Sequence, residues 1–431
     1  MSELKVGTQV KLRNGTSCKV KKELGRGGQG IVYLVEYNGK DYALKWYLRS
    51  CSDAFYENLE RNVKNGAPSP NFLWPEAITE HQDDSFGYLM KLRPQGYEEI
   101  GAFMLAKAKF SNVNCLLKAC LEICTAFQIL HINGLSYQDM NDGNFFINPQ
   151  TGDVLICDND NVAPNGVNIT GVQGKSRYMA PEIVDKESLP NRYTDYFSLS
   201  VILFILIFVN MPFEGVKALS CPCMSEEEEK KLNGKGGVFI FDPNDSSNRP
   251  VSGVHTNAIR RWPLFPQILR NAFIKTFSKQ AIMEPTKRLM DRDWQKVFIQ
   301  VRSLFIKCPV CGKHTFIEID NSENKCIECG KIFSKPLVLK LQNYSVPLVP
   351  GQNIYQCQVS SSEKDYEKLA GEVIRNTIDP RRWGIRNISG QTWQIRTSTG
   401  ENKLVENNGV MPVLPDLVIR FNKEVTGTII K

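Results

Sequence analysis

The chain has 431 residues, of which 42% are hydrophobic and 23% charged, with a formal net charge of +7. This length exceeds what one hydrophobic core usually supports, so we expect two or three domains. The composition is typical of a folded globular protein. The positive excess is small and forms no dense lysine and arginine block, which argues against a nucleic-acid partner.

Residues 1–11 lack the apolar core of a secretory signal. The longest apolar run, residues 201–209, is much shorter than the roughly eighteen residues of a membrane helix. We therefore expect a cytoplasmic protein with no membrane partner. Of thirteen cysteines, four form two C-x-x-C pairs, which favours reduced thiols plus one metal site over a disulfide framework.

The texture of the chain changes twice. Strand-like and helical runs alternate in residues 1–305, paired cysteines dominate residues 306–335, and short β-rich runs such as residues 392–397 occupy the rest. We predict a large α+β unit over 1–305, a small metal-stabilised segment over 306–335, and an all-β domain over 336–431.

Near the N-terminus, residues 25–32 read G-x-G-x-x-G-x-V between two strand-like runs. Gly25, Gly27 and Gly30 allow the backbone to approach phosphates without obstruction by a Cβ. A dinucleotide-binding fold uses a similar glycine pattern but continues into a helix. Here a strand continues instead, and a second strand carries Lys45, so we expect this lysine to clamp nucleotide phosphates.

A lone lysine on a strand is usually a surface residue, and only the preceding glycine loop favours the clamp. Such a lysine needs a carboxylate partner. The helical run at residues 52–64 offers Glu57 and Glu60, and we prefer Glu60 from its spacing to residues 70–73.

Further along, residues 137–144 read Y-Q-D-M-N-D-G-N before a short apolar strand, and the next strand leads to Asp158. Taken singly, such an Asp and Asn cluster is ordinary turn chemistry. The segment nevertheless resembles the H-R-D-x-x-x-x-N catalytic loop of protein kinases, and Asp158 stands where that family has the aspartate of D-F-G. Residues 174–182 resemble the end of an activation segment, and Arg288 the arginine that pairs with Glu182.

The resemblance implies a bilobal kinase fold with an N-lobe over residues 1–92 and a C-lobe over 93–305. It further implies use of ATP with Mg²⁺ or Mn²⁺ and phosphorylation of protein serine or threonine. In this scheme Asn144 and Asp158 hold the metal ion, and Asp139, Lys45 and Lys175 form the catalytic set. The ATP-binding set is Gly25, Gly27, Gly30, Val32, Ala43, Lys45, Glu60, Asn144 and Asp158.

The sequence departs from the family in several places. Gln138 replaces the arginine that pairs with a phosphate on the activation segment, so we predict activity that does not depend on phosphorylation of Thr170 or Ser176. Asn141 replaces a catalytic-loop lysine. We expect Lys175, on the opposite wall, to supply the missing charge, although a solvent-facing lysine is the plain alternative.

Two further replacements, Asn159 and Asp160 for the Phe-Gly of D-F-G, put polar residues where a hydrophobic stack is usual. Since the ATP and metal residues are all present, we favour an active enzyme. The alternative is a nucleotide-binding pseudokinase scaffold that recruits partners through its C-terminal part.

That part contains two C-x-x-C pairs fourteen residues apart, each followed by glycine, which predicts a closed structural zinc site. A redox C-x-x-C is the competing interpretation. The ligands are Cys308, Cys311, Cys326 and Cys329.

The final β-rich residues loosely resemble a forkhead-associated β-sandwich without the Arg and Ser-x-x-His elements that read phosphothreonine. A sandwich that acts as an interaction module is therefore favoured over a phosphopeptide reader. A kinase joined to such a tail resembles bacterial kinases associated with a phosphatase and a von Willebrand-type protein, which suggests those partners.

Overall fold

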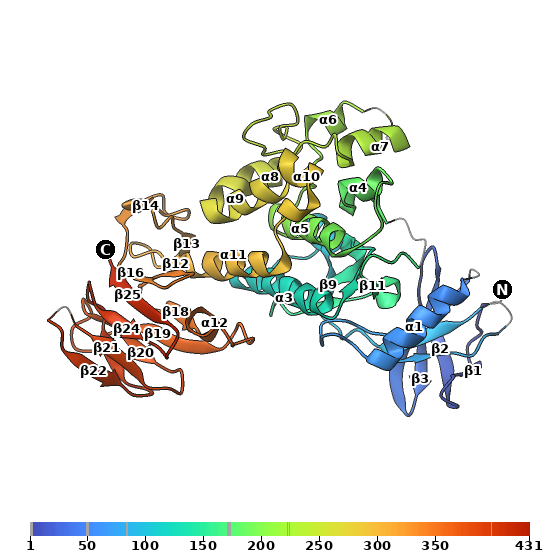
Figure 1. The fold of residues 1–431 in the computed structure, drawn as a ribbon, viewed down its shortest axis with the longest axis horizontal. Coiled ribbons are helices and arrows are strands. Elements are labelled where there is room, and N and C mark those ends of the chain that lie inside the picture. Colours follow the sequence, from blue (N-terminus) through green and yellow to red (C-terminus); the bar gives the residue numbers. More distant parts are fainter. Residues whose placement is uncertain are drawn as a thin grey trace. The chain divides into compact units, whose positions relative to one another are not determined.

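The computed structural model describes residues 3–48, 51–82, 85–169, 174–221, 223, 225–397 and 399–431. They form two compact units. The first consists of Met1–Ile259 and Phe273–Arg292, and the second of Arg260–Ala272 and Asp293–Lys431. Figure 1 shows the chain coloured from its N-terminus to its C-terminus.

The first unit begins with a six-stranded antiparallel sheet in the order β1-β2-β3-β4-β6-β5. Alternating buried and exposed residues in β1 and in the first part of β2 fit a sheet with one covered face. The strands are β1 (Gln9–Lys11), β2 (Ser17–Arg26), β3 (Gly30–Tyr37), β4 (Lys40–Tyr47), β5 (Ala77–Ile78) and β6 (Gly87–Lys91).

One helix, α1 (Asp53–Asn65), packs on this sheet. The side chain of Ser52 caps its start by accepting a hydrogen bond from the backbone N–H of Phe55, and Gly66, at φ 74°, ends it. Phe55 and Leu59 on its buried face join Tyr47 and Tyr88 of the sheet in one hydrophobic cluster. The cluster holds α1 beside the strand that carries Lys45.

The remainder of the first unit is mainly helical around α3 (Val113–Ile132) and α5 (Arg192–Phe208), which contact each other. Every residue of α5 from Thr194 onward is buried, which explains the apolar run noted in the sequence. By length and composition α3 passes the test for a membrane-spanning helix, but 67% of its most apolar window is buried inside the protein, as in the core helix of a globular domain.

Short elements complete this half of the chain. The strands are β7 (Glu98–Glu99), β8 (Leu135–Ser136), β9 (Phe145–Ile147), β10 (Val154–Ile156) and β11 (Ala163–Pro164). The helices are α2 (Ile100–Met104), α4 (Pro181–Val184), α6 (Val216–Leu219), α7 (Glu226–Asn233), α8 (Thr256–Arg261), α9 (Gln267–Thr276), α10 (Lys279–Met283) and α11 (Asp291–Ser303). Of these, α8, α9 and α11 run across a boundary between the two units.

The second unit contains the cysteine segment and a β-sandwich. Two hairpins carry the cysteines: β12 (Phe305–Lys307) with β13 (His314–Phe316), and β14 (Glu323–Lys325) with β15 (Ile332–Ser334). The sandwich has a six-stranded sheet in the order β17-β16-β25-β24-β21-β22 and a four-stranded sheet in the order β18-β19-β20-β23.

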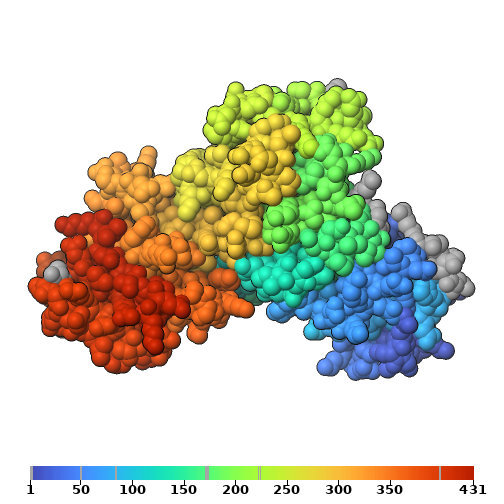
Figure 2. Space-filling view, viewed as in Figure 1, coloured from blue at the N-terminus to red at the C-terminus, as the bar shows by residue number. Residues whose placement is uncertain are grey.

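One hydrophobic core lies between the two sheets and includes Trp393, packed edge-on against Phe421 at a ring-centroid distance of 4.9 Å. Figure 2 shows the sandwich as a continuous packed surface in orange and red. Its elements are β16 (Val338–Lys340), β17 (Ser345–Pro347), β18 (Asn353–Tyr355), α12 (Gln356–Val359), β19 (Leu369–Arg375), β20 (Trp383–Asn387), β21 (Trp393–Arg396), β22 (Asn402–Val405), β23 (Val410–Pro412), β24 (Val418–Arg420) and β25 (Thr426–Ile430). The predicted order of an α+β unit, a cysteine segment and an all-β end is confirmed.

Candidate active site

The glycine-rich loop is the turn between β2 and β3, closed by a hydrogen bond from Gly27 N–H to the carbonyl oxygen of Gly30 (2.9 Å). A Cβ at Gly25, Gly27 or Gly28 would meet nothing within 4 Å, so there is open space beside this backbone. Gly30 is different, because its Cβ would come 2.1 Å from the carbonyl oxygen of Trp46. Three glycines thus leave backbone accessible, and the fourth lets two strands approach.

Val32, Ala43 and Lys45 share one face of the sheet. Val32 lies opposite Lys45 in the β3/β4 register, and Ala43 precedes Lys45 by two residues on β4. The structure therefore groups these three predicted nucleotide contacts beneath the glycine-rich loop.

The Lys45 side chain is buried, with 8% of it exposed, and its ammonium has three acceptors. Nζ lies 2.8 Å from Asp160 Oδ2, 3.3 Å from Asp158 Oδ1 and 3.3 Å from Gln29 Oε1 in the glycine-rich loop. Burial disfavours the ammonium, but the charges of Asp160 and Asp158 outweigh it, and the pKa of Lys45 is raised above its ordinary value. Lys45 is therefore charged, and three acceptors engage its ammonium.

The structure does not bring Glu60 to Lys45. Glu60 contacts Arg13 in an ion pair in which both side chains are substantially exposed, and Glu57 is exposed as well. The inward face of α1 instead presents Asn58 and Asn62. A helical period identifies which residues share a face of α1 but does not tell which face points toward Lys45. Here the buried face of α1 contains Phe55, Asn58, Leu59 and Asn62, and the two glutamates lie on the outer side.

In the catalytic loop, Asp195 at the start of α5 accepts hydrogen bonds from the backbone N–H groups of Tyr137 (2.6 Å) and Gln138 (3.3 Å). The Asn144 amide donates to the backbone oxygen of Asp139 (2.7 Å). Burial, followed by the neighbouring charge of Asp158, raises the pKa of Asp139 above its usual range. The loop is thus held rigidly, with a carboxylate well suited to orient a hydroxyl group or take up its proton.

The two predicted metal ligands lie on neighbouring segments. The N–H of Cys157 donates to the backbone oxygen of Asn144 (2.8 Å), which ties the start of β9 to the end of β10. Asp158 follows in a left-handed conformation (φ 52°) with 45% of its side chain exposed. A carboxylate and an amide oxygen at one edge of a phosphate site suit the hard-oxygen preference of Mg²⁺, so these residues fit the ion that the family implies.

Lys175 reaches the catalytic loop from the other side. Its Nζ lies 3.4 Å from Asn141 Oδ1 and 3.4 Å from Asp142 Oδ1, while 60% of the side chain stays exposed. The backbone of the preceding residue, Gly174, lies close to the catalytic loop, since a Cβ added to Gly174 would be 3.0 Å from Asp139 Oδ1. The ammonium therefore stands beside Asn141, where the family has a lysine.

Gln138 also makes a specific contact. Its backbone is left-handed (φ 74°), and its Nε2 donates to the carbonyl oxygen of Val167 (2.7 Å) and to Ser136 Oγ (3.4 Å). A neutral amide thus links the catalytic loop to the start of the activation segment. Thr170 lies outside the described residues, and Ser176 Oγ donates to Glu229 Oε2 (2.5 Å).

The predicted ion pair in the C-lobe is present. Arg288 donates from two nitrogens to Glu182 at 2.7 and 2.6 Å, with 0% and 8% of the two side chains exposed. The guanidinium also donates to the backbone oxygens of Tyr193 (3.0 Å) and Ala281 (3.1 Å). The pair is structural, since it closes the end of the activation segment against the helical core.

In the second unit the four cysteine sulfurs of the C-x-x-C pairs lie within 4.8 Å of one another. Cys311 Sγ and Cys326 Sγ are 3.8 Å apart, which matches the edge of about 3.8 Å expected for a tetrahedron with Zn–S bonds of about 2.3 Å. Gly312 and Gly330, at φ 73° and 70°, close equivalent turns after each pair. The donor set fits zinc. Among the described residues this is the one such group of metal-binding side chains.

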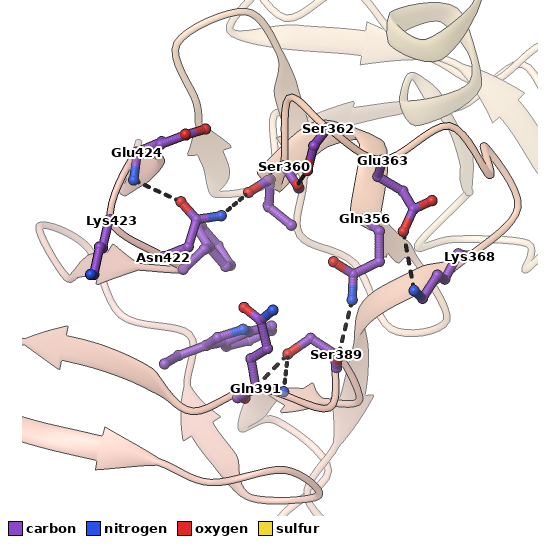
Figure 3. Close-up of a pocket in the computed structure, with 13 residues that line it drawn as sticks. Gln356, Ser360, Ser362, Glu363, Lys368, Ser389, Gln391, Asn422, Lys423 and Glu424 are labelled. Carbon is purple, nitrogen blue, oxygen red and sulfur yellow. Dashed lines mark hydrogen bonds and ion pairs between the residues drawn. The ribbon is translucent and has the colours of Figure 1, made fainter.

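A polar cavity of about 410 Å³ opens in the sandwich (Figure 3). Trp393 and Phe421 contribute its apolar wall, and Lys368, paired with Glu363 at 3.1 Å, lies at the rim. Lys423 and Glu424 also line it, so the cavity carries mixed charge and is not a strong anion site.

Sequence reasoning missed the residues that surround Lys45. Asp160 is fully buried and also accepts a hydrogen bond from Tyr47 Oη (2.5 Å). Asn58 and Asn62 both donate to the backbone oxygen of Val162, at 2.9 and 2.8 Å. The available signal was an extra carboxylate two residues after Asp158, combined with amides on the inward face of α1.

Comparison with known proteins agrees with this geometry. Residues 18–231 match the family model described as protein kinase domain. The chain is 21% identical over 203 residues to "Mitogen-activated protein kinase kinase kinase 7" of Drosophila melanogaster, covering 46% of this chain and 29% of that protein. It is 23% identical over 213 residues to a probable serine/threonine-protein kinase of Saccharomyces cerevisiae (46% and 34%) and 28% identical over 224 residues to "Protein kinase C delta type" of Mus musculus (48% and 31%).

The chain thus spans about a third of the length of these curated relatives. The N-terminal sheet with α1, the helical core around α5 and the residues between them define a bilobal protein kinase domain. A four-cysteine cluster and a β-rich region follow it.

Proposed function

We propose that this chain is an ATP- and Mg²⁺-dependent protein kinase that phosphorylates serine or threonine in proteins. The observation that carries the proposal is the convergence of Lys45, Asp139, Asn144 and Asp158 beneath an open glycine loop. The name of the Saccharomyces cerevisiae relative, a probable serine/threonine-protein kinase, supports the serine/threonine preference. The bound metal would neutralise phosphate charge, while Lys45 holds the phosphates and Asp139 orients the acceptor hydroxyl.

We also propose that activity does not require a phosphorylated activation segment. The Gln138 contact to Val167 supports this idea, because it links loop and segment without an ion pair. Lys175 would supply the positive charge that is missing from the catalytic loop, where Asn141 replaces the lysine of the family. Its ammonium already bridges toward the loop, and a flexible, exposed lysine needs little movement to reach a transferring phosphate.

The test is transfer of radiolabelled γ-phosphate from ATP to a protein acceptor, compared between the wild type and Asp139→Ala. We expect label on serine or threonine with the wild type and a loss of at least about a hundredfold with the variant. Equal labelling would refute the assignment of Asp139. Label on tyrosine alone would refute the acceptor class.

A pseudokinase scaffold is the second candidate, and two observations favour it. Both carboxylates near Lys45 already engage its ammonium, and no lysine stands in the catalytic loop itself. ATP binding in the wild type without any transfer to added or endogenous proteins would support this candidate.

For the C-terminal part we propose a structural zinc and a forkhead-associated-like interaction module. The sulfur spacing supports the zinc, and the two-sheet sandwich supports the module. A partner phosphatase and a von Willebrand-type protein, and a cytoplasmic site of action, complete the proposal. Co-purification with such partners, lost when residues 336–431 are removed, tests the module.

A further inference from the structure

The carboxylate that holds Lys45 comes from an unexpected place. Among the described residues, the side chains that accept hydrogen bonds from its ammonium are one glutamine and two aspartates of residues 158–162, here called the metal-binding loop, and none lies on α1. Asp160 makes the shortest of these contacts at 2.8 Å, and its side chain has no exposed area. Asp158 makes a longer contact with the ammonium, at 3.3 Å, and 45% of its side chain is exposed, which leaves it accessible to a metal ion.

Asp160 is itself fixed from a second side. Its Oδ2 accepts from Tyr47 Oη at 2.5 Å, and Tyr47 lies two residues after Lys45 on the same strand, so it shares that face. Burial, followed by the charge of Asp160, raises the pKa of Tyr47 well above its ordinary value, so the phenol remains a donor. Lys45, Tyr47 and Asp160 form one buried triad.

The amides of α1 then acquire a different role. Asn58 and Asn62 both grip the backbone oxygen of Val162, two residues after Asp160. In this arrangement α1 supports the metal-binding loop through hydrogen bonds and supplies no charged partner to Lys45. A displacement of α1 would loosen the loop but would not by itself remove the partner of Lys45.

The geometry points to Asp160 as the positioning residue that aligns Lys45 for nucleotide phosphate, in place of a glutamate on α1. This inference rests on the proposed kinase function and deepens it. Asp160 acts through Lys45 and need not touch ATP or the acceptor. An unpaired lysine in a buried site would lose both its orientation and the support for its charge.

The test uses the full-length chain and compares Asp160→Asn with two glutamate variants of α1. We expect Asp160→Asn to lower kcat/KM for ATP by at least about tenfold. Glu57→Gln, on the exposed face of α1, serves as the matched control and should keep the wild-type value. Glu60→Gln tests the competing partner, and a loss as large as that of Asp160→Asn would overturn the inference.

A double-mutant cycle separates alignment of Lys45 from a general structural role. If Asp160 acts through Lys45, Asp160→Asn should cause no further loss in a Lys45→Met background. A further loss of about tenfold there would overturn the inference. Tyr47→Phe, which keeps the ring but frees Asp160, should fall between the wild type and Asp160→Asn. Retention of full kcat/KM by both Tyr47→Phe and Asp160→Asn would also refute it.

Binding of ATP, followed by fluorescence of a nucleotide analogue, keeps the two proposals distinguishable. Weaker analogue binding by Asp160→Asn but not by Glu60→Gln supports the role of Asp160 in positioning Lys45 (the lysine anchor), even when the wild type transfers no phosphate. The absence of transfer would then count against the proposed function alone. Unchanged analogue binding in a folded Asp160→Asn variant would count against the anchor alone.

Discussion

The ion pair between Arg288 and Glu182 allows a stability change to be worked out from the structure. Arg288→Met would remove four hydrogen bonds, two to the carboxylate and two to backbone oxygens, and would leave Glu182 buried without its cation. Breaking a buried pair from one side costs about 3–5 kcal/mol in the free energy of unfolding. At about 2–3 °C per kcal/mol for a domain of this size, the Tm of the kinase domain should fall by roughly 6–15 °C.

The assay is thermal unfolding followed by circular dichroism, with the kinase-domain transition compared between variants. Arg177→Met is the matched control, because Arg177 pairs with Glu214 at 3.1 Å while 50% of its side chain is exposed. An exposed pair contributes about 0–1 kcal/mol, so this variant should shift the Tm by about 3 °C at most. Arg288→Lys should lie between the two. Equal, small shifts for Arg288→Met and Arg177→Met would refute the reasoning.

Four shorter predictions follow from other contacts. Lys175→Met should lower kcat about tenfold with ATP binding unchanged, because its ammonium stands beside the catalytic loop; an unchanged steady-state kcat would show a merely solvent-facing lysine. Alanine at both Thr170 and Ser176 should leave the rate of transfer within about twofold, and a complete loss in the radiolabel assay would contradict phosphorylation-independent activity. Burial lowers the pKa of His131, but hydrogen bonds to two aspartates outweigh burial and raise the pKa to about 9. The stabilisation by the charged imidazole should therefore be complete below about pH 6.5 and be lost as the pH rises through 9. The free energy of unfolding measured in urea should fall with pH over this window, and His131→Gln should flatten that dependence. Removal of zinc with a strong chelator should unfold the cysteine segment, seen as loss of amide-exchange protection there and release of about one zinc per chain, and a metal content of zero in protein purified without chelator would refute the zinc site.

The residues that sequence reasoning located are those with fixed spacing in short motifs. Asp139 and Asn144 sit on one loop, Asp158 follows one strand later, and a local pattern suffices to identify them. The glycine-rich loop and Lys45 are also close in sequence, because β3 follows the loop and a hairpin joins β3 to β4, the strand that carries Lys45. Short loops and hairpins join these residues, so their proximity in space can be expected from their proximity in sequence.

The partner of Lys45 could not be identified in this way. Glu60 and Glu57 satisfy a helical period, but the rotation of α1 about its own axis is decided by packing of Phe55 and Leu59 against the sheet. Asp160 lies in a run of aspartates and asparagines that resembles ordinary turn chemistry. Its complete burial beside an ammonium distinguishes it from a turn residue, and burial is a tertiary property.

The three acceptors around Lys45 also determine how a nucleotide can enter. A lysine ammonium has three N–H donors, and Asp160, Asp158 and Gln29 occupy all of them. Binding of a phosphate oxygen to this ammonium is therefore an exchange of ligands and not a simple addition. The neutral amide of Gln29 is the acceptor that costs least to release, since an uncharged group gains less from the ammonium than a carboxylate does. Release of the Gln29 side chain removes one contact of the glycine-rich loop, while the hydrogen bond from Leu48 N–H to the backbone oxygen of Gln29 (3.1 Å) remains. Under the proposed function we therefore expect ATP binding to be coupled to a rearrangement of this side chain.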